Sequence, residues 1–141
     1  PCGPCYHLGV SVVSNGGFDL GNIGFTSALS SACVCMPNTY CIESNANRKC
    51  IDNLNIPSAS SDPQDQYLIV EGLGAGAIWQ QNVTLDATLT YDFSFWINPS
   101  VGLNQSDKPD LEVRIGTQVI LTLPASALSG GWAEYSAHFS G

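Results

Sequence analysis

The chain has 141 residues, enough for one domain with a hydrophobic core, and 11% of them are charged, against roughly a quarter in ordinary globular proteins. Its formal net charge is −8 with four Lys and Arg residues in all, so no basic surface is available to neutralise the phosphates of nucleic acid or of an anionic membrane. The longest apolar runs have the length of a strand, which excludes a membrane-spanning helix. We therefore expect a single domain over residues 1–141, with no nucleic-acid partner and no membrane insertion.

Six cysteines lie in the first 50 residues, and the rest of the chain has none. They are Cys2, Cys5, Cys33, Cys35, Cys41 and Cys50. An even number of cysteines in a chain with so few lysines is typical of an oxidised protein, and it predicts up to three disulfides whose pairing is left open. The first residue, Pro1, is typical of a processed mature terminus. The expected location is secreted, extracellular and at the cell surface.

Two alternatives to structural disulfides exist for these cysteines. Cys2-Gly3-Pro4-Cys5 has the spacing of a redox-active dithiol, but such a motif follows a buried strand and opens a helix, and only Pro1 precedes it here. Zinc is the second alternative, because His7 adjoins this pair and Cys33 and Cys35 form another close pair. The spacings fit no compact four-ligand site, so disulfides are the preferred interpretation.

The first predicted elements are a short strand over Leu8–Val13 and a turn at Asn15-Gly16-Gly17. From Gly21 to about Gln66 the pattern dissolves, because this stretch contains three prolines and four cysteines and keeps no period of 2 or 3.6. Residues 21–66 are interpreted as an irregular, Cys-rich excursion that packs over the fold and is held by disulfides. One short strand is expected within it, near Thr39–Glu43.

The strongest structural signal is an alternation of apolar and polar residues that runs from Thr88 to Ile97. The apolar members are Leu89, Tyr91, Phe93, Phe95 and Ile97. Such a run predicts a half-buried antiparallel strand, and the preceding run Ile78–Leu85 is predicted to pair with it across the turn Asp86-Ala87. Trp96 falls on the polar side, so its indole is either covered by a loop, which is the preferred interpretation, or exposed as a contact surface.

Four more strands are predicted around this hairpin. They are Tyr67–Val70, Asp110–Ile115, Val119–Leu123 and Trp132–Phe139, the last with Ala133, Tyr135, Ala137 and Phe139 on its buried side. A three-residue turn at Gly116-Thr117-Gln118, with one residue in a left-handed conformation, sets the apolar residues of its two flanking strands against each other. Pro124–Gly131 has room for one helical turn. With no amphipathic helix, the sequence predicts an all-β fold, an antiparallel β-sandwich.

Several short motifs follow one another in a recognisable order between residues 10 and 140. They are Asn15-Gly16-Gly17-Phe18-Asp19, Gly24-Phe25-Thr26-Ser27, Tyr67-Leu68-Ile69-Val70, Ile78-Trp79-Gln80-Gln81-Asn82-Val83, Tyr91-Asp92-Phe93-Ser94-Phe95-Trp96, and Gly131-Trp132 with Tyr135 and Phe139. This order resembles that of secreted carbohydrate-binding-module-like domains with a galactose-binding-like jelly-roll fold, as found in surface and gliding-associated proteins of Bacteroidetes. The resemblance implies a jelly-roll topology for the sandwich.

The resemblance also implies a candidate metal site, although no cofactor is otherwise required. In these domains the acidic residue of the opening motif often helps to hold a structural calcium ion, and the matching residue is Asp19. Asp62 or Asp65, with backbone carbonyls, can supply the further oxygen ligands that calcium needs. The alternative is that Asp19 caps its own turn.

Nothing in the sequence points to catalysis. The two histidines lie at opposite ends of the chain, and no motif places two of the four glutamates as an acid/base pair. No nucleophile elbow, metal-binding helix or phosphate loop is present. We therefore expect that the protein is not an enzyme.

The preferred function is that of a self-assembling structural subunit of an extracellular filament or matrix. The resembled domains continue with two more strands beyond the position of Gly141, so an unpaired sheet edge is expected here, and copies of the chain can join by strand addition. The residues of the donated assembly strand are Leu8, Val10, Val12 and Val13.

The alternative function is a carbohydrate-binding, lectin-like adhesion module. Indole rings stack on sugar faces, and the candidates are Trp79, Trp96 and Trp132. Two glycosylation sequons are also present, Asn82-Val83-Thr84 and Asn104-Gln105-Ser106. Asn104 lies in a polar loop, whereas Asn82 falls in a predicted strand and is accessible only if its side chain faces solvent.

Overall fold

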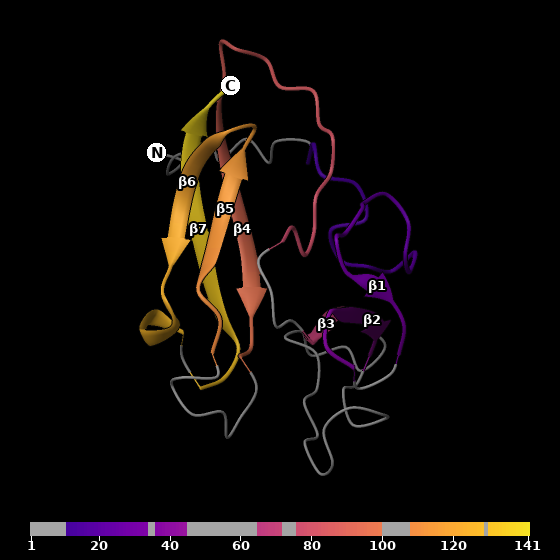
Figure 1. The fold of residues 1–141 in the computed structure, drawn as a ribbon. Coiled ribbons are helices and arrows are strands. Elements are labelled where there is room, and N and C mark those ends of the chain that lie inside the picture. The colour runs from indigo at the N-terminus through magenta and orange to yellow at the C-terminus, as the bar shows by residue number, and fades with distance from the viewer. Residues whose placement is uncertain (1–10, 34–35, 45–64, 72–75, 100–107, 129) are drawn as a thin grey trace, which may run out of the picture.

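The computed structural model describes residues 11–33, 36–44, 65–71, 76–99, 108–128 and 130–141 (Figure 1). The regular elements in these ranges are seven β-strands and one 3₁₀ turn. They are β1 (Ser30–Ser31), β2 (Thr39–Glu43), β3 (Tyr67–Glu71), β4 (Thr90–Ile97), β5 (Leu111–Ile115), β6 (Gln118–Leu123), η3 (Ala125–Ala127) and β7 (Ala133–Ser140). The predicted all-β class is confirmed, and in the described ranges no helix is long and apolar enough to cross a membrane.

Strands β1, β2 and β3 form one small sheet, with β1 parallel and β3 antiparallel to the central β2. The β2–β3 register places Cys41 opposite Ile69. Strand β2 has the bounds predicted for it, so the Cys-rich excursion contains regular structure. Residues 45–64 of the excursion lie outside the described ranges.

Strands β4 and β7 pair antiparallel over eight residues each, although 35 residues separate them in the sequence from Asn98 to Trp132. Every second residue of both strands faces inward, as the alternation predicted, and the register sets Phe93 opposite Ala137 and Phe95 opposite Tyr135. Apolar side chains therefore face apolar side chains along the whole inner side of the pair.

The predicted hairpin between Ile78–Leu85 and β4 is wrong. The segment around Gln80 instead forms an isolated antiparallel bridge with Thr26. The pattern of this segment explains the difference, because neighbours Ile78 and Trp79 are both half-buried and an amide, Gln81, takes the next inward position. Strand β7 has an apolar residue at every inward position of its ladder with β4, whereas Ile78–Leu85 has an amide at one of its inward positions.

A tight turn precedes β4. The backbone N–H of Leu89 donates to the Asp86 carbonyl at 3.1 Å, and the Asp86 carboxylate accepts from the N–H (2.8 Å) and hydroxyl (2.7 Å) of Thr88. The predicted turn at Asp86-Ala87 is therefore present. Because Leu89 belongs to this turn and not to the strand, its side chain is 53% exposed instead of buried.

Strands β5 and β6 form a hairpin whose outer register, Leu111 with Leu123 and Val113 with Leu121, is the predicted one. The turn, however, has two residues, Gly116-Thr117, and Ile115 pairs with Gln118. A bulge between Val113 and Arg114 absorbs the extra residue, Ile120, and so restores the register. Gly116 takes the expected left-handed conformation, with φ of 59°.

The β5–β6 hairpin lies against the β4–β7 pair, with β6 next to β7 (Figure 1). The most buried side chains of this part, Leu123, Leu128 and Ala137, come from β6, the segment after η3 and β7. The Tyr135 hydroxyl donates to the Ala127 carbonyl at 3.1 Å and so attaches η3 to β7. This arrangement is consistent with a β-sandwich.

A chain of aromatic contacts joins the N-terminal part of the described chain to the β4–β7 pair. Successive ring centroids lie 5.5 to 6.5 Å apart. The rings, in order of contact, are those of Phe18, Phe25, Trp79, Phe93, Phe95 and Tyr135. The segment around Trp79 is therefore held by packing onto the inner side of β4, not by a shared ladder.

Candidate functional site

The outer face of the β4–β7 pair is the surface on which exposed polar and aromatic side chains are brought into register. It consists of Thr90, Asp92, Ser94 and Trp96 on β4 and Glu134, Ser136, His138 and Ser140 on β7, all of them exposed. Because side chains alternate along a strand, burial of the apolar set on the inner side forces this set outward. We call these eight residues the outer face.

Trp96 is 52% exposed, so the predicted cover by a loop is wrong and the alternative, an exposed contact surface, is the one observed. Its neighbours Phe95 and Ile97 occupy the inner side of β4, and the indole therefore projects outward. Glu134 on β7 lies directly opposite in the register. Opposite residues of an antiparallel pair have Cβ atoms about 5 Å apart, so a molecule lying on the indole is within reach of this carboxylate.

Hydroxyl groups and a contact between an aspartate and a histidine continue the outer face away from Trp96. Ser94 lies opposite Ser136, and beyond them Asp92 Oδ1 contacts His138 Nδ1. Asp92 and His138 side chains are each 74% exposed, so this pair is solvated and contributes little to stability. The outer face thus presents one aromatic plane, two carboxylates, one imidazole and several hydroxyls, and it has no Lys or Arg.

Sequence reasoning missed Glu134 and His138 as members of a site. It placed β4 next to Ile78–Leu85, so the residues that lie across from Trp96 and Asp92 were not considered. The available signal was the eight-residue alternation of Ala133–Ser140, in which every second residue is polar, as in β4.

The three candidate tryptophans are not brought together. Trp79 is half-buried between Phe25 and Phe93, with ring centroids 6.5 Å from each. Trp132 is half-buried and packs edge-on to Tyr67 at 5.4 Å. These two rings belong to the packing of the fold, which leaves Trp96 as the exposed indole of the three.

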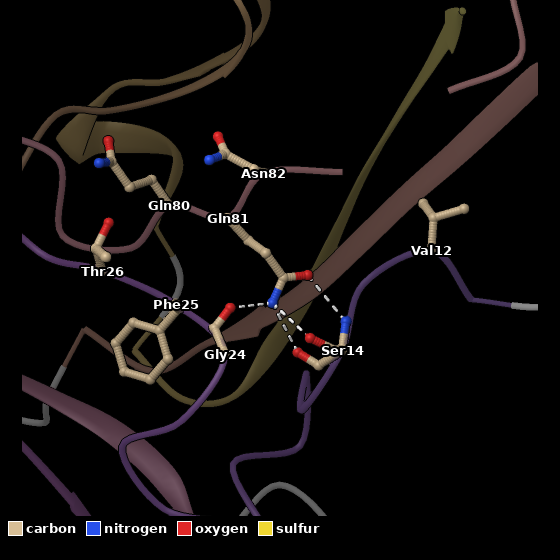
Figure 2. Close-up of a pocket in the computed structure, with 8 residues that line it drawn as sticks. All are labelled: Val12, Ser14, Gly24, Phe25, Thr26, Gln80, Gln81 and Asn82. Carbon is tan, nitrogen blue, oxygen red and sulfur yellow. Dashed lines mark hydrogen bonds between the residues drawn. The ribbon is translucent and has the colours of Figure 1, made fainter. Parts of the chain in front are cut away.

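A separate cavity of about 430 Å³ lies between the loop that contains Ser14 and Gly24 and the segment 80–82 (Figure 2). Its lining residues are Val12, Ser14, Gly24, Phe25, Thr26, Gln80, Gln81 and Asn82. The Gln81 amide crosses it: Oε1 accepts from Ser14 N at 2.9 Å, and Nε2 donates to Ser14 O, Ser14 Oγ and Gly24 O. Its amide therefore ties the loop to the segment 80–82.

The proposed assembly strand is described in part. Val12 is 43% exposed and lines the cavity, and Val13 is half-buried, but residues 11–13 have no strand conformation, so this part of the predicted strand Leu8–Val13 is wrong. The Ser11 hydroxyl is bonded to the backbone of Val13, which bends the chain locally. Leu8 and Val10 lie outside the described ranges.

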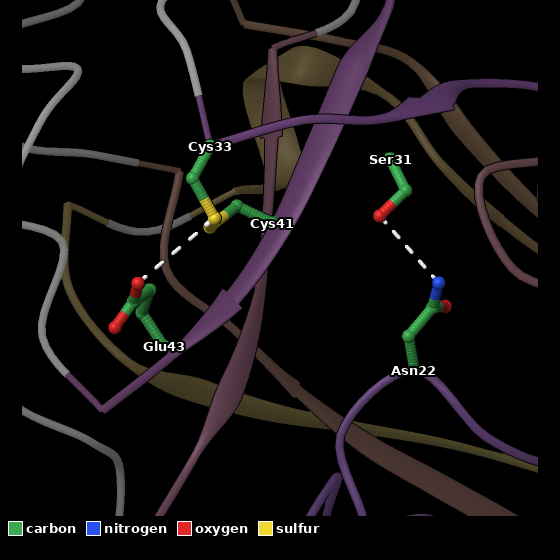
Figure 3. Close-up of a disulfide and its surroundings, with 5 residues drawn as sticks. All are labelled: Asn22, Ser31, Cys33, Cys41 and Glu43. Carbon is green, nitrogen blue, oxygen red and sulfur yellow. Dashed lines mark hydrogen bonds between the residues drawn. A yellow bond between two sulfur atoms is a disulfide. The ribbon is translucent and has the colours of Figure 1, made fainter.

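One disulfide of the predicted set is present in the described chain, Cys33–Cys41, with Cα atoms 4.9 Å apart (Figure 3). It joins the chain after β1 to β2. Cys2, Cys5, Cys35 and Cys50 lie outside the described ranges. Together with Glu43, the two sulfur atoms make the one group of three potential metal ligands found among the described residues, but both sulfurs are committed to the disulfide.

The candidate calcium ligands in the described part of the chain are not gathered into a metal site. Asp19 is exposed and Asp65 is half-buried, and neither belongs to a group of three ligands within the described chain. An Asp19 carboxylate oxygen lies 3.2 Å from the point where a Cβ on Gly17 would be. The side chain thus lies close to its own turn, but it makes no hydrogen bond there with any described residue, and the Asn15 side chain is the one that bonds this loop. Asp62 is outside the described ranges.

One of the two glycosylation sequons lies within the residues that the structure describes. Asn82 and Thr84 are both exposed on an extended segment without strand pairing, which corrects the expectation that Asn82 lies in a strand. Asn104 lies outside the described ranges.

These features define an all-β protein with an exposed polar and aromatic sheet face. No family model, no curated protein and no solved structure matches the chain.

Proposed function

We propose that the chain is an extracellular carbohydrate-binding module that binds glycans on the outer face of the β4–β7 pair. The observation that carries the proposal is the exposed Trp96 at one end of a row of hydroxyl and carboxylate side chains. The resemblance in motif order supports the same class, and with it we propose a galactose-binding-like jelly-roll topology and a secreted protein at the cell surface. No catalytic role is part of the proposal.

The chemistry of the outer face matches that of a sugar. The face of an indole ring is electron-rich, and the C–H groups on one side of a pyranose carry a small positive charge, so the two surfaces stack. The sugar hydroxyls can then exchange hydrogen bonds with Ser94 and Ser136, which both donate and accept, and with the acceptor oxygens of Glu134.

The shape of the surface favours an extended ligand. The outer face lies on two paired strands of eight residues and is exposed along its length, so it offers contacts along a line and does not enclose a single sugar. In a linear oligosaccharide that runs from Trp96 toward Asp92 and His138, each sugar unit makes its own set of contacts with the outer face. We expect weak binding of monosaccharides and tighter binding of longer oligomers.

The test is binding of the chain to a glycan array, followed by calorimetry with the best oligosaccharide for the wild type and Trp96→Ala. Loss of the stacking surface should weaken binding about tenfold, equivalent to about 1.4 kcal/mol. Val119→Ala is the matched control, because Val119 is also a large exposed apolar residue, on β6 and away from the outer face. Equal affinities for the wild type and Trp96→Ala would contradict the proposal.

Self-assembly by strand addition is a second candidate function. It is favoured by the sheet topology, since within the described ranges β4 pairs with β7 alone and its other edge has no partner there. An unpaired edge of this length is a template for another strand. Electron microscopy and light scattering should show polymers of the wild type, whereas a wild type that is monomeric at high concentration would exclude this function.

A further inference from the structure

The electrostatics of the outer face distinguish between kinds of glycan. Two carboxylates lie on it, but their surroundings differ. Asp92 is in contact with the His138 imidazole, whereas Glu134 takes part in no ion pair with any described residue. The unpaired carboxylate is the one beside the indole.

The two cations of the described chain are engaged elsewhere. Lys108 Nζ donates to the Leu128 carbonyl at 3.1 Å, and Arg114 forms an ion pair with Glu112 at 2.6 Å on β5. The whole chain carries a formal charge of −8. On a chain of this net charge, a surface with two carboxylates and no Lys or Arg disfavours glycans with carboxylate or sulfate groups and attracts cations.

An amino sugar fits both parts of this end of the outer face. Its pyranose ring can stack on Trp96, and an ammonium group at the ring edge is then within reach of the Glu134 carboxylate across the strand pair. The same cation gains from the electron-rich face of the indole. A neutral or N-acetylated sugar can make the stacking contact but lacks the charge that Glu134 would bind.

We infer that the outer face selects glycans with free amino groups, such as oligomers of 2-amino-2-deoxyhexose, and that Glu134 determines this specificity while Trp96 supplies the common stacking surface. The inference rests on the proposed carbohydrate-binding function and names its ligand class. A neutral sugar remains a ligand of the same surface, with lower affinity.

The experiment compares glucosamine tetramers with N-acetylglucosamine tetramers by calorimetry at low ionic strength and pH 6. The wild type should bind the amino oligomer about fivefold more tightly, as expected for an exposed ion pair, and added salt should reduce the difference. Glu134→Gln should bring the affinities for the two oligomers together, because the amide carries no charge to bind the ammonium group. Glu71→Gln is the matched control, since Glu71 is an exposed carboxylate at the end of β3, outside the outer face.

The outcomes separate the inference from the function on which it rests. Equal affinities of the wild type for the two oligomers, or a preference that survives Glu134→Gln, would overturn the amino-sugar specificity and leave glycan binding intact. A loss of preference in Glu71→Gln equal to that in Glu134→Gln would reduce the effect to general attraction by an acidic protein and would also overturn the inference. Absence of binding to every glycan tested would overturn the proposed function itself.

Discussion

The Gln81 side chain offers a sharp test of how the N-terminal loop is held on this fold. The loop that contains Ser14 and Gly24 has no regular strand, and the Gln81 amide bonds to both of these residues (Figure 2). Replacing Gln81 with alanine removes an acceptor for one backbone N–H and a donor to two backbone carbonyls. The loop also carries Phe18 and Phe25 of the aromatic core, so its detachment is coupled to unfolding.

The loss of stability expected for Gln81→Ala follows from these contacts. Nε2 has two hydrogens for three acceptors, so about three of the four contacts count as full hydrogen bonds, each with a net worth of about 0.5–1.5 kcal/mol. Ser14 is exposed and water replaces part of what is lost, which favours the lower end of that range. We expect Gln81→Ala to lower the free energy of unfolding by about 2 kcal/mol.

A nearly isosteric variant separates hydrogen bonding from packing. Gln81→Glu keeps the acceptor for Ser14 N–H but turns the donor into a carboxylate oxygen that faces the carbonyls of Ser14 and Gly24. It should therefore destabilise the fold at least as much as Gln81→Ala, despite its conserved size. Gln80→Ala is the control, because Gln80 is the exposed neighbour and its side chain makes no hydrogen bond with any described residue.

Urea denaturation followed by tryptophan fluorescence measures these changes. With a slope of roughly 1.5 kcal/mol per molar urea, a loss of about 2 kcal/mol lowers the midpoint by about 1.3 M. A change below about 0.5 kcal/mol in Gln81→Ala, or equal effects of Gln80→Ala and Gln81→Ala, would refute the tether. Near-wild-type stability of Gln81→Glu would show that the hydrogen bonds donated by Gln81 Nε2 do not stabilise the fold.

Three further predictions concern other parts of the fold. Replacing Cys33 and Cys41 together with alanine should cost about 2–3 kcal/mol in urea denaturation, because the disulfide closes a short loop with a sequence separation of 8; an unchanged midpoint would contradict this. Gly116→Ala should lower the free energy of unfolding by about 1 kcal/mol, because the backbone there is left-handed. Gly24→Ala should lower it by about 2 kcal/mol, because an added Cβ there also meets the Ser14 hydroxyl at 3.1 Å. Equal losses of stability in the two variants would contradict the crowding at Gly24. Hydrogen bonds from the Thr88 hydroxyl and then its N–H lower the pKa of Asp86 below 3.8, so this stabilisation is present above that pH and is lost as the pH falls through the lowered value; Asp86→Ala should flatten the acid limb of the stability curve, and a carboxyl titration by NMR at or above 3.8 would contradict the shift.

Local pattern was sufficient to predict the strands whose two sides differ. In β4 and β7 the inner positions, such as Phe93 and Tyr135, are apolar and the outer positions are polar, so period two is visible in the sequence itself. The same holds for β5, where Leu111, Val113 and Ile115 alternate with charged residues. Strand β2 was found at its observed bounds even though it lies in the irregular excursion.

Pairing could not be predicted in the same way, because it depends on contacts between distant segments. The run Ile78–Leu85 is next to β4 in sequence, and a neighbour is the default partner of a strand. What decides against it is the packing of Trp79 onto Phe25 and Phe93, together with the bridge from Gln80 to Thr26, and none of these contacts is written in the local pattern.

The candidate site was predictable only in part for the same reason. Alternation placed Trp96 on the polar side of its strand, but whether another segment covers it is a property of the whole fold. Its position opposite Glu134 follows from the pairing with β7, whereas its exposure depends on how the other segments of the fold are placed. Similarly, the bulge that accommodates Ile120 is set by the geometry of the Gly116-Thr117 turn, which changes the register by one residue.

The long separation between β4 and β7 has a consequence for synthesis on the ribosome. When β4 leaves the exit tunnel, its ladder partner has not yet emerged, and the rings of Tyr91, Phe93 and Phe95 have no neighbouring strand to cover them. At about 5–20 residues per second, the intervening stretch from Asn98 to Trp132 leaves this strand open for several seconds, long enough for another nascent chain to pair with it. The opposite side of the strand carries the charge of Asp92 and the hydroxyls of Thr90 and Ser94. These polar groups disfavour pairing with neighbouring chains until β7 has emerged.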